Sequence, residues 1–318
     1  MRSQRRLVSP VSVNLTPNTF IGGVAAEIPT KAALATKLNI AESNISYFAV
    51  VGSDIETKIE IDYYFPHEIW SGNTSITYFK EKVEGRCVSM GRQPFKLTTK
   101  LREVEFLRDV LIEDGCFNKS SLLRGIFPNS TIMYYMSTFL DNSARLIYLP
   151  KLKFNFSLTQ FLAFGSVKNI YMSIAEEIGS TQANNDHFSR SPQGVKIWAN
   201  PVLQTSNNGA EEGDLAYARQ YKSAIIDYSQ MEPDFFILPN PITDLSFSKN
   251  GSDITITYST PISVYQIVDF EIYVNDVLHS RNTTNLKILS GLIIGDRVKV
   301  KATDIYYNKS ASNIITIS

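Results

Sequence analysis

The chain has 318 residues, of which 43% are hydrophobic, and its 31 Lys and Arg residues balance 31 Asp and Glu residues. That length allows two or three domains with a sizeable core. The zero net charge argues against a nucleic-acid-binding protein, which normally carries a basic excess on at least one face. No stretch approaches the roughly 18 apolar residues that a membrane span requires, so we expect no membrane insertion.

Residues 1–65 are predicted to form an N-terminal arm followed by a capping hairpin. The start contains three arginines but no apolar run of the length that a secretory signal needs, so we expect synthesis and assembly in the cytoplasm. The alanine-rich stretch 25–41 predicts about two or three helical turns. Two segments rich in β-branched residues, 45–51 and 58–65, flank a Gly-Ser-Asp turn and predict a hairpin. We expect the arm to contact a partner.

A repeat follows, and residues 66–200 are predicted to form a solenoid. Four phenylalanines recur at a constant interval of 22 residues, and three further apolar columns keep the same interval. The four columns are Phe95, Phe117, Phe139, Phe161; Val104, Ile126, Tyr148, Ile170; Val88, Val110, Ile132, Phe154; and Phe106, Pro128, Pro150, Met172. A period of about 20–29 residues is typical of stacked units that are each too small to bury their own apolar face. Each unit offers two short β-segments, and the third copy has Arg145 where a leucine is expected.

The repeat resembles the BspA-type leucine-rich repeat. The stretches VLIEDGCF (110–117), IFP (126–128), STF (137–139) and IYLP (147–150) follow that family's pattern. The alanine that usually precedes the phenylalanine is absent, because Pro94, Cys116 and Thr138 occupy its position. The resemblance implies a short solenoid of a divergent type, and solenoids usually serve as binding surfaces.

A polar insertion, residues 180–194, lengthens the last coil of the predicted solenoid. Insertions in solenoids map to loops on one face, and that face is often the binding face. We therefore place the candidate ligand-binding residues in this insertion. They are Asn184, Asn185, Asp186, His187 and Arg190.

The last third of the chain is predicted to hold a cap, a linker and a second domain. Residues 201–238 would close the solenoid and continue into a proline-containing linker of limited flexibility. Residues 239–318 change to short alternating strands, and about seven of them in roughly 80 residues predict a β-sandwich. The stretch 291–313 resembles a fibronectin type III domain, although Val298 occupies the tyrosine-corner position. The whole chain is therefore predicted to be mainly β, a short leucine-rich-repeat solenoid followed by a fibronectin III or immunoglobulin-like sandwich.

Residue types that carry chemistry are few and scattered. No HExxH, GxSxG or P-loop sequence occurs. Cys87 and Cys116 lack metal-ligand spacing, and we expect two free thiols, with a disulfide as the alternative. A polysaccharide-degrading enzyme needs two convergent carboxylates, and we interpret the acidic residues near the strands as solvated surface. They are Glu103, Glu105, Asp109, Glu113 and Asp114. We predict no enzyme activity, no metal and no cofactor, and we interpret Trp70 and Trp198 as residues that cap the solenoid ends.

Repeats of this type followed by a fibronectin-like domain resemble modular virion and adhesion proteins associated with Bacteroidetes and their phages. The resemblance implies a bacteriophage virion protein of a tail, tail fibre or spike that binds a host surface glycan or protein. The N-terminal arm would contact other virion proteins, and the protein would be oligomeric in the particle. A bacterial cell-surface adhesin or glycan-binding protein is the alternative, and it requires an export signal. An enzyme acting on host polysaccharide is a third possibility.

Overall fold

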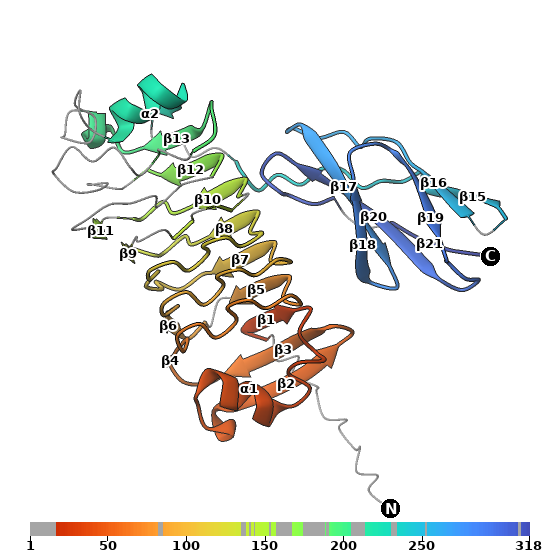
Figure 1. Ribbon diagram of the computed structural model, residues 1–318, viewed down its shortest axis with the longest axis horizontal. Coiled ribbons are helices and arrows are strands. Elements are labelled where there is room, and N and C mark those ends of the chain that lie inside the picture. Colours follow the sequence, from red (N-terminus) through yellow and green to blue (C-terminus); the bar gives the residue numbers. More distant parts are fainter. Residues whose placement is uncertain are drawn as a thin grey trace, which may run out of the picture.

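The computed structural model shows a mainly β protein with a β-solenoid of about five turns and a C-terminal module of β-sheets (Figure 1). The predicted mainly β character and the predicted solenoid are confirmed. The structure describes residues 17–81, 85–134, 138–139, 141–142, 144–152, 154–156, 167–173, 188, 191–204, 214–229, 234–251, 253–310 and 313–318.

The N-terminal end of the solenoid is closed by a helix and a hairpin. Strand β1 (Thr19–Gly22) is followed by helix α1 (Lys31–Leu38) and the 3-10 turn η1 (Glu42–Asn44), and then by β2 (Ile45–Val51) and β3 (Asp54–Ile59). Helix α1 buries its leucines against the first coil, so it covers apolar side chains that would otherwise face water. The predicted helix and the first predicted strand are confirmed.

The second strand of the hairpin begins earlier than predicted. Only two residues separate β2 from β3, and Gly52 takes the positive φ of 64° that such a tight turn requires. Pairing therefore starts at Asp54, opposite Val51. The chain leaves the hairpin after Ile59, so the predicted strand 58–65 is wrong in its bounds, and Ile61 is 37% exposed.

The main sheet of the solenoid runs through its whole length (Figure 1). Its strands pair in parallel from coil to coil, and β1 joins this stack to the N-terminal hairpin by antiparallel pairing. The parallel strands are β5 (Tyr78–Glu81), β7 (Glu103–Phe106), β8 (Arg124–Ile126), β10 (Leu146–Tyr148), β12 (Asn169–Met172), β13 (Lys196–Ala199) and β14 (Ile225–Asp227). Short strands on the opposite side complete the coils, as the two β-segments per repeat predict. They are β4 (Tyr63–Tyr64), β6 (Cys87–Ser89), β9 (Ile132–Tyr134) and β11 (Phe154–Phe156).

The phenylalanines at the 22-residue interval form a stack inside the solenoid. The rings of Phe95 and Phe117 lie 5.5 Å apart and 6° from parallel, and those of Phe117 and Phe139 lie 5.2 Å apart at 7°. All three side chains are fully buried. Trp70 extends the stack by one coil, at 5.5 Å and 13° from Phe95, which fits its predicted capping role. Phe161 lies outside the described residues.

A shift of one residue interrupts three of the four predicted apolar columns. Phe106 stacks on Phe127 and not on Pro128, and Ile112 pairs with Met133, so Val110 and Ile132 are one residue out of step. The column of Val104 shows the shift most clearly. Val104 pairs with Gly125, not with Ile126, and the column continues through Ile147 and Ile170 at intervals of 21, 22 and 23 residues. The inward position on β8 is Gly125, because the side chains of Phe127 and Ile147 occupy the space that a larger residue would need. A Cβ atom on Gly125 would lie 2.8 Å from the Phe127 ring. Ile126 and Tyr148, which share the 22-residue interval with Val104, therefore face outward.

Glu81 is a buried carboxyl group at the end of β5. Two backbone N–H groups, from Arg86 and Cys87, donate hydrogen bonds to it, and the Tyr63 hydroxyl donates a third at 3.1 Å. Burial raises the pKa of Glu81 to about 7, although these three donors favour the ionised form. The carboxyl group therefore ties the short strands β4 and β6 to the main sheet and becomes charged near neutral pH.

Glu81 makes the stability of the solenoid depend on pH. Its folded pKa lies above its ordinary value of 4.5, so the native state holds a proton that the unfolded state has lost. The contribution of Glu81 to stability should be complete below pH 4.5 and fall by up to about 3 kcal/mol as the pH rises to 7. Denaturant titrations of Glu81→Gln should lack this decline, while the exposed control Glu42→Gln should keep it. An unchanged decline in Glu81→Gln would contradict the assignment.

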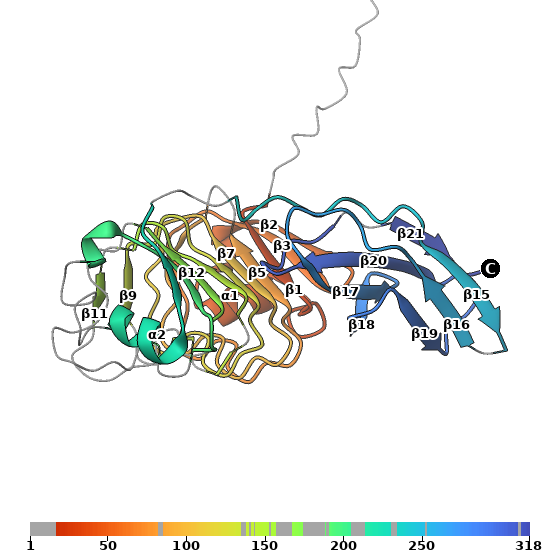
Figure 2. The same ribbon diagram turned by 90° about the horizontal axis from the view of Figure 1, so that it is seen from above.

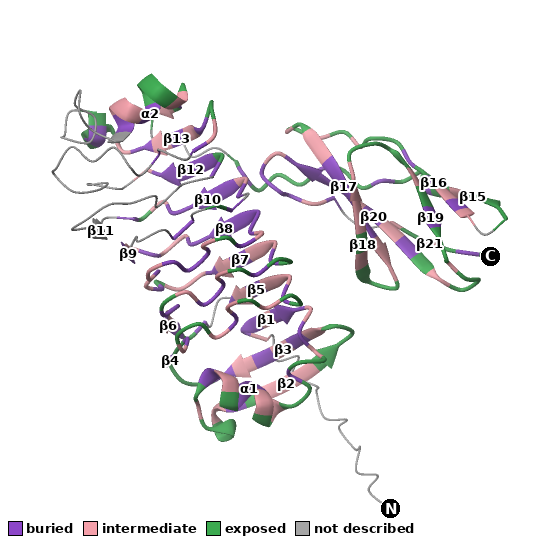
Figure 3. Ribbon diagram, viewed as in Figure 1, coloured by how far each residue is buried: buried purple, intermediate pink, exposed green. Residues whose placement is uncertain are grey.

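The C-terminal end of the solenoid carries η2 (Pro201–Gln204) and helix α2 (Asp214–Lys222) before β14. Leu203, Leu215 and Ala218 are buried and belong to the solenoid core. The helix therefore covers the last coil, as the cap predicted within residues 201–238 would. Figure 3 shows buried residues along the stacked strands and exposed residues on the outer side of α2.

The C-terminal module, residues 239–318, consists of two antiparallel sheets that share one apolar core. Ile256 from one sheet and Ile272 and Val300 from the other are fully buried in that core. One sheet holds β15 (Ser246–Asn250), β16 (Asp253–Thr257) and β19 (Leu286–Ser290). The other holds β18 (Val277–Asn282), β17 (Ile267–Val274), β20 (Arg297–Asp304) and β21 (Asn313–Thr316). Seven strands are thus found in the described part of the module, matching the predicted number.

Candidate functional site

The C-terminal module lies against the solenoid near β10 and β12 (Figures 1 and 2). Aromatic and charged side chains meet at this junction. Because residues alternate along a strand, the outward positions on β10, β12 and β13 are Tyr148, Tyr171 and Trp198. Tyr148 and Tyr171 stack at 5.2 Å. Trp198 therefore lies on the sheet face, and its predicted role as an end cap is wrong.

Phe235 fills the space between the aromatic column and the module. Its side chain is fully buried, with ring centroids 5.0 Å from Trp198, 5.5 Å from Tyr171 and 4.9 Å from Tyr306 of the module. Each of these contacts is edge-to-face, the geometry that the ring quadrupole favours. The segment predicted as a linker thus supplies the central apolar contact of the junction.

Two arginines of the solenoid hold the module by polar contacts. Arg145, which breaks the leucine pattern, forms an ion pair with Asp269 and donates to the Asp304 carbonyl oxygen at 3.1 Å. Arg124 donates to the Asn308 side chain at 2.9 Å. The Asp304 carboxylate shapes this turn, because it accepts hydrogen bonds from the backbone N–H groups of Tyr306 and Asn308. The module is therefore held on the solenoid by polar contacts as well as by the aromatic contact.

Glu271 is a fully buried carboxylate of the junction. It contacts Arg281 at 2.9 Å and Lys309 at 3.2 Å, and the Tyr307 and Tyr273 hydroxyls donate to it. Burial alone would raise the pKa of Glu271, but Lys309, Tyr307 and Arg281 lower it to about 2. Glu271 is thus ionised at every physiological pH, and its charge organises the cations around it.

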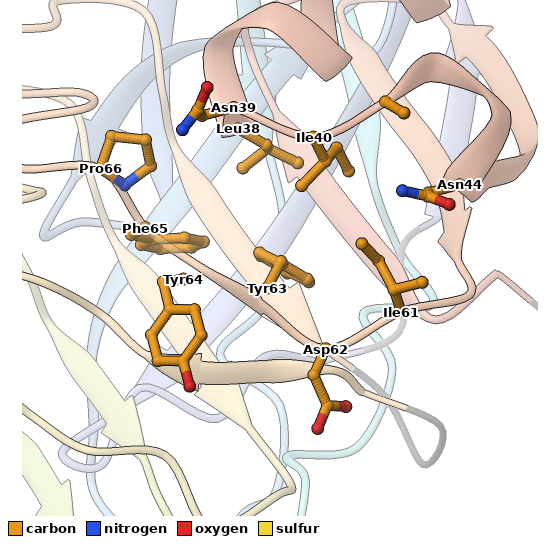
Figure 4. Close-up of a pocket in the computed structure, with 11 residues that line it drawn as sticks. Leu38, Asn39, Ile40, Asn44, Ile61, Asp62, Tyr63, Tyr64, Phe65 and Pro66 are labelled. Carbon is orange, nitrogen blue, oxygen red and sulfur yellow. The ribbon is translucent and has the colours of Figure 1, made fainter.

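A pocket of about 460 Å³ lies at the N-terminal end of the solenoid (Figure 4). Leu38 and Ile40 form one wall, and Ile61 faces them. Asp62 and Tyr64 point away from that wall at the rim. Hydrogen bonding from Arg108 lowers the pKa of Asp62 and holds its carboxylate. The pocket therefore combines apolar side chains with the polar Asn39 and Asn44 and with an acid held by Arg108.

The predicted contact residues Asn184, Asn185, Asp186, His187 and Arg190 all lie outside the described residues. The structure therefore does not place them relative to the junction or the pocket.

The acidic residues near the strands interact with other parts of the protein. Glu103 pairs with Lys80 at 2.7 Å, and Asp114 pairs with Arg92 at 3.3 Å. Asp109 accepts a hydrogen bond from the Thr131 backbone, and Glu113 accepts one from the Ser89 hydroxyl. Glu105 also interacts within the protein. Four of these five carboxylates thus each have a different partner.

Neither thiol is part of a disulfide, which confirms the expectation of free cysteines. Cys87 and Cys116 are fully buried, and burial raises the pKa of both thiols. Among the described residues, no group of three or more His, Cys, Asp or Glu side chains could hold a metal ion. In the same part of the chain, no helix is long and apolar enough to cross a membrane.

Sequence reasoning missed the junction. Phe235 stood in a segment that prolines mark as a linker, and Tyr306 and Tyr307 stood in a short polar turn. One available signal was Arg145, a charged residue at a position where the repeat calls for an apolar one. The other was the Phe235-Phe236 pair, since two large apolar residues in a linker need a surface to bury them.

Comparison with known proteins gives little. No model of a known family matches the chain, and no curated protein matches it. Among solved structures, the chain is similar to the spore cortex lytic enzyme SleM of Clostridium perfringens, with a TM-score of 0.27 and 11% sequence identity. The match covers 48% of this chain and 67% of that one. A likeness at this TM-score carries no argument about fold or activity.

Proposed function

We propose that the protein is a bacteriophage virion component, part of a tail, tail fibre or spike, that binds the host cell surface through its repeat solenoid. In this proposal the coils are divergent leucine-rich repeats of the BspA type, and the C-terminal module is a fibronectin III-like sandwich. The observation that carries it is the junction, where Phe235 and Arg145 fix the module to the solenoid. A rigid, preorganised body binds without the entropic cost of ordering two mobile domains.

The N-terminal end supports attachment to the particle. The pocket lined by Leu38, Ile40 and Ile61 lies beside helix α1 at the N-terminal end of the solenoid. A segment of a neighbouring virion protein would cover Ile61, which is 37% exposed. Several copies anchored in this way would present several host contacts at once, which raises avidity by roughly 10²–10⁴ over a single site.

A bacterial adhesin or glycan-binding protein is the second candidate. The same rigid junction and the same repeat would serve a protein displayed on a cell. The two candidates differ in where the protein occurs, since a virion component co-purifies with particles and an adhesin with the cell envelope. Antibodies against the C-terminal module, applied to purified particles and to cell envelopes, separate them.

Host binding is tested with labelled full-length protein. We expect saturable binding to intact host cells and competition with phage adsorption. Deletion of residues 180–187 should weaken binding at least about tenfold, since these residues belong to our predicted contact region. The deletion stops before Phe188, which is fully buried in the solenoid core and has to be kept for the fold. Deleting residues 260–264, a loop of the C-terminal module, is the matched control. Equal adsorption by the 180–187 deletion and the intact protein would remove that region from the proposal.

A further inference from the structure

The four-stranded sheet of the C-terminal module carries a charged outer face next to the solenoid. Glu271 on β17 lies directly opposite Arg281 on β18 and opposite Lys301 on β20. The turn that contains Tyr307 and Lys309 joins this face to the junction, and Lys309 reaches back to Glu271. The solenoid contributes Arg102, which precedes β7. Side chains from two parts of the protein therefore meet here.

Cations outnumber carboxylates in this cluster. Three of them surround the Tyr307 ring, with Arg145 at 5.6 Å, Arg281 at 5.3 Å and Lys309 at 4.4 Å from its centre. The carboxylates of Asp269 and Glu271 pair with these three. Nearby Lys80 is matched by Glu103. Each of these carboxylates thus forms its ion pairs with cations other than Arg102 and Lys301.

Arg102 and Lys301 are the two half-buried cations that remain. In the described part of the chain, neither has a carboxylate within ion-pair distance. Burial and the neighbouring Arg281 lower the pKa of Arg102, and burial with Lys309 and Lys299 lowers the pKa of Lys301. Partly buried charges that repel one another cost stability unless a counter-charge joins them.

Unpaired donors point to the same need. The buried Nε–H groups of Arg102, Arg124 and Arg281 have no hydrogen-bond partner within the described residues. Arg124 is 8% exposed, so its free donor lies deep in the junction. Guanidinium groups recognise oxyanions by donating two hydrogen bonds side by side. A carboxylate, sulfate or phosphate group is the chemical class that pairs with such donors and with excess positive charge.

We propose that this junction binds an anionic glycan, with Arg102 and Lys301 contacting its acidic groups. The proposal rests on the proposed function, since it names the class of surface ligand that the protein would recognise. The zero net charge of the chain provides no long-range attraction for nucleic acid.

The test uses the full-length protein at fixed ionic strength, with calorimetric titration of polygalacturonate, dextran sulfate and neutral dextran. We expect the acidic polymers to bind and neutral dextran not to bind, and the stronger of the two acidic polymers identifies carboxylate or sulfate as the preferred group. Lys301→Gln and Arg102→Gln should each weaken binding at least about tenfold. Lys287→Gln, a half-buried lysine on the other sheet, is the matched control and should bind like the wild type.

Unfolding temperatures distinguish a ligand site from a structural contact. At low salt without polymer, Lys301→Gln should unfold at the same temperature as the wild type or higher, since it removes repulsion. Polymer should raise the unfolding temperature of the wild type and leave Lys301→Gln unchanged. A lower unfolding temperature for Lys301→Gln, unchanged binding by both variants, or equally tight binding of a single-stranded oligonucleotide would overturn the proposal.

Cell binding separates this inference from the proposed function. If acidic polymer competes with labelled protein for host cells, both stand. If the protein binds cells and acidic polymer neither binds nor competes, the anionic site fails and host recognition stands. If polymer binds through Lys301 but cells are not bound, the anionic site stands and the proposed host function fails.

Discussion

Replacing Phe117 with alanine should lower the free energy of unfolding of the solenoid by about 3–5 kcal/mol. The ring is fully buried and stacks on Phe95 on one side and on Phe139 on the other. Removing it leaves a cavity in the middle of the stack, and β-strands on both sides hold the coils too firmly for the gap to close. Denaturant unfolding followed by circular dichroism measures the loss.

The control for this substitution is Tyr64→Ala. Tyr64 belongs to the same solenoid but is 62% exposed, so its removal should change the free energy of unfolding by no more than about 0.5 kcal/mol. A Phe117→Ala protein that unfolds at the wild-type denaturant concentration would show that the stack contributes little and that the coils are held by strand pairing alone.

The stack was predictable because it obeys one rule along the chain. Each coil returns the chain to the same place after a fixed number of residues, and one large ring must fill the centre of every coil. Phe95, Phe117 and Phe139 therefore keep a constant interval in the sequence as well as in space. Trp70 was harder to assign to the stack, because 25 residues and not 22 separate it from Phe95.

The register of the main sheet was not predictable from the same interval. Strand positions alternate between the core and the outward face, so a change of one residue in coil length exchanges the two faces. The coil from Val104 to Gly125 is one residue shorter than the regular repeat, and the coil from Ile147 to Ile170 is one residue longer. The two deviations cancel, so Ile170 lies three full repeats after Val104. The shift in the two coils between them is therefore not visible in the spacing.

The junction was not predictable because it depends on contacts between distant parts of the chain. Arg145 and Asp269 are 124 residues apart, and Arg124 and Asn308 are 184 apart. No sequence pattern in either segment predicts which distant residue it contacts. The sequence did show that Arg145 occupies a position where the repeat has apolar residues. A charged residue at such a position indicates a contact made outside the solenoid.

Replacing Phe235 with alanine should release the C-terminal module from the solenoid without unfolding either part. The ring is the central apolar contact of the junction and touches Trp198, Tyr171 and Tyr306. Its loss removes about 3–5 kcal/mol of packing, while the solenoid core and the module core contain none of these residues. The polar contacts of Arg145 and Arg124 alone would then be exposed to water and weakened.

Three measurements report release of the module. The radius of gyration from solution scattering should rise, protease should cut the chain between residues 230 and 245, and tryptophan emission should shift to the red because Trp198 loses its cover while Trp70 stays in the core. Leu238→Ala is the matched control in the same segment, since Leu238 is 59% exposed. If Phe235→Ala keeps the scattering profile and protease resistance of Leu238→Ala, the arginine contacts alone hold the module. The rigid body behind the proposed host recognition would then depend on charge, and high salt should separate the module from the solenoid.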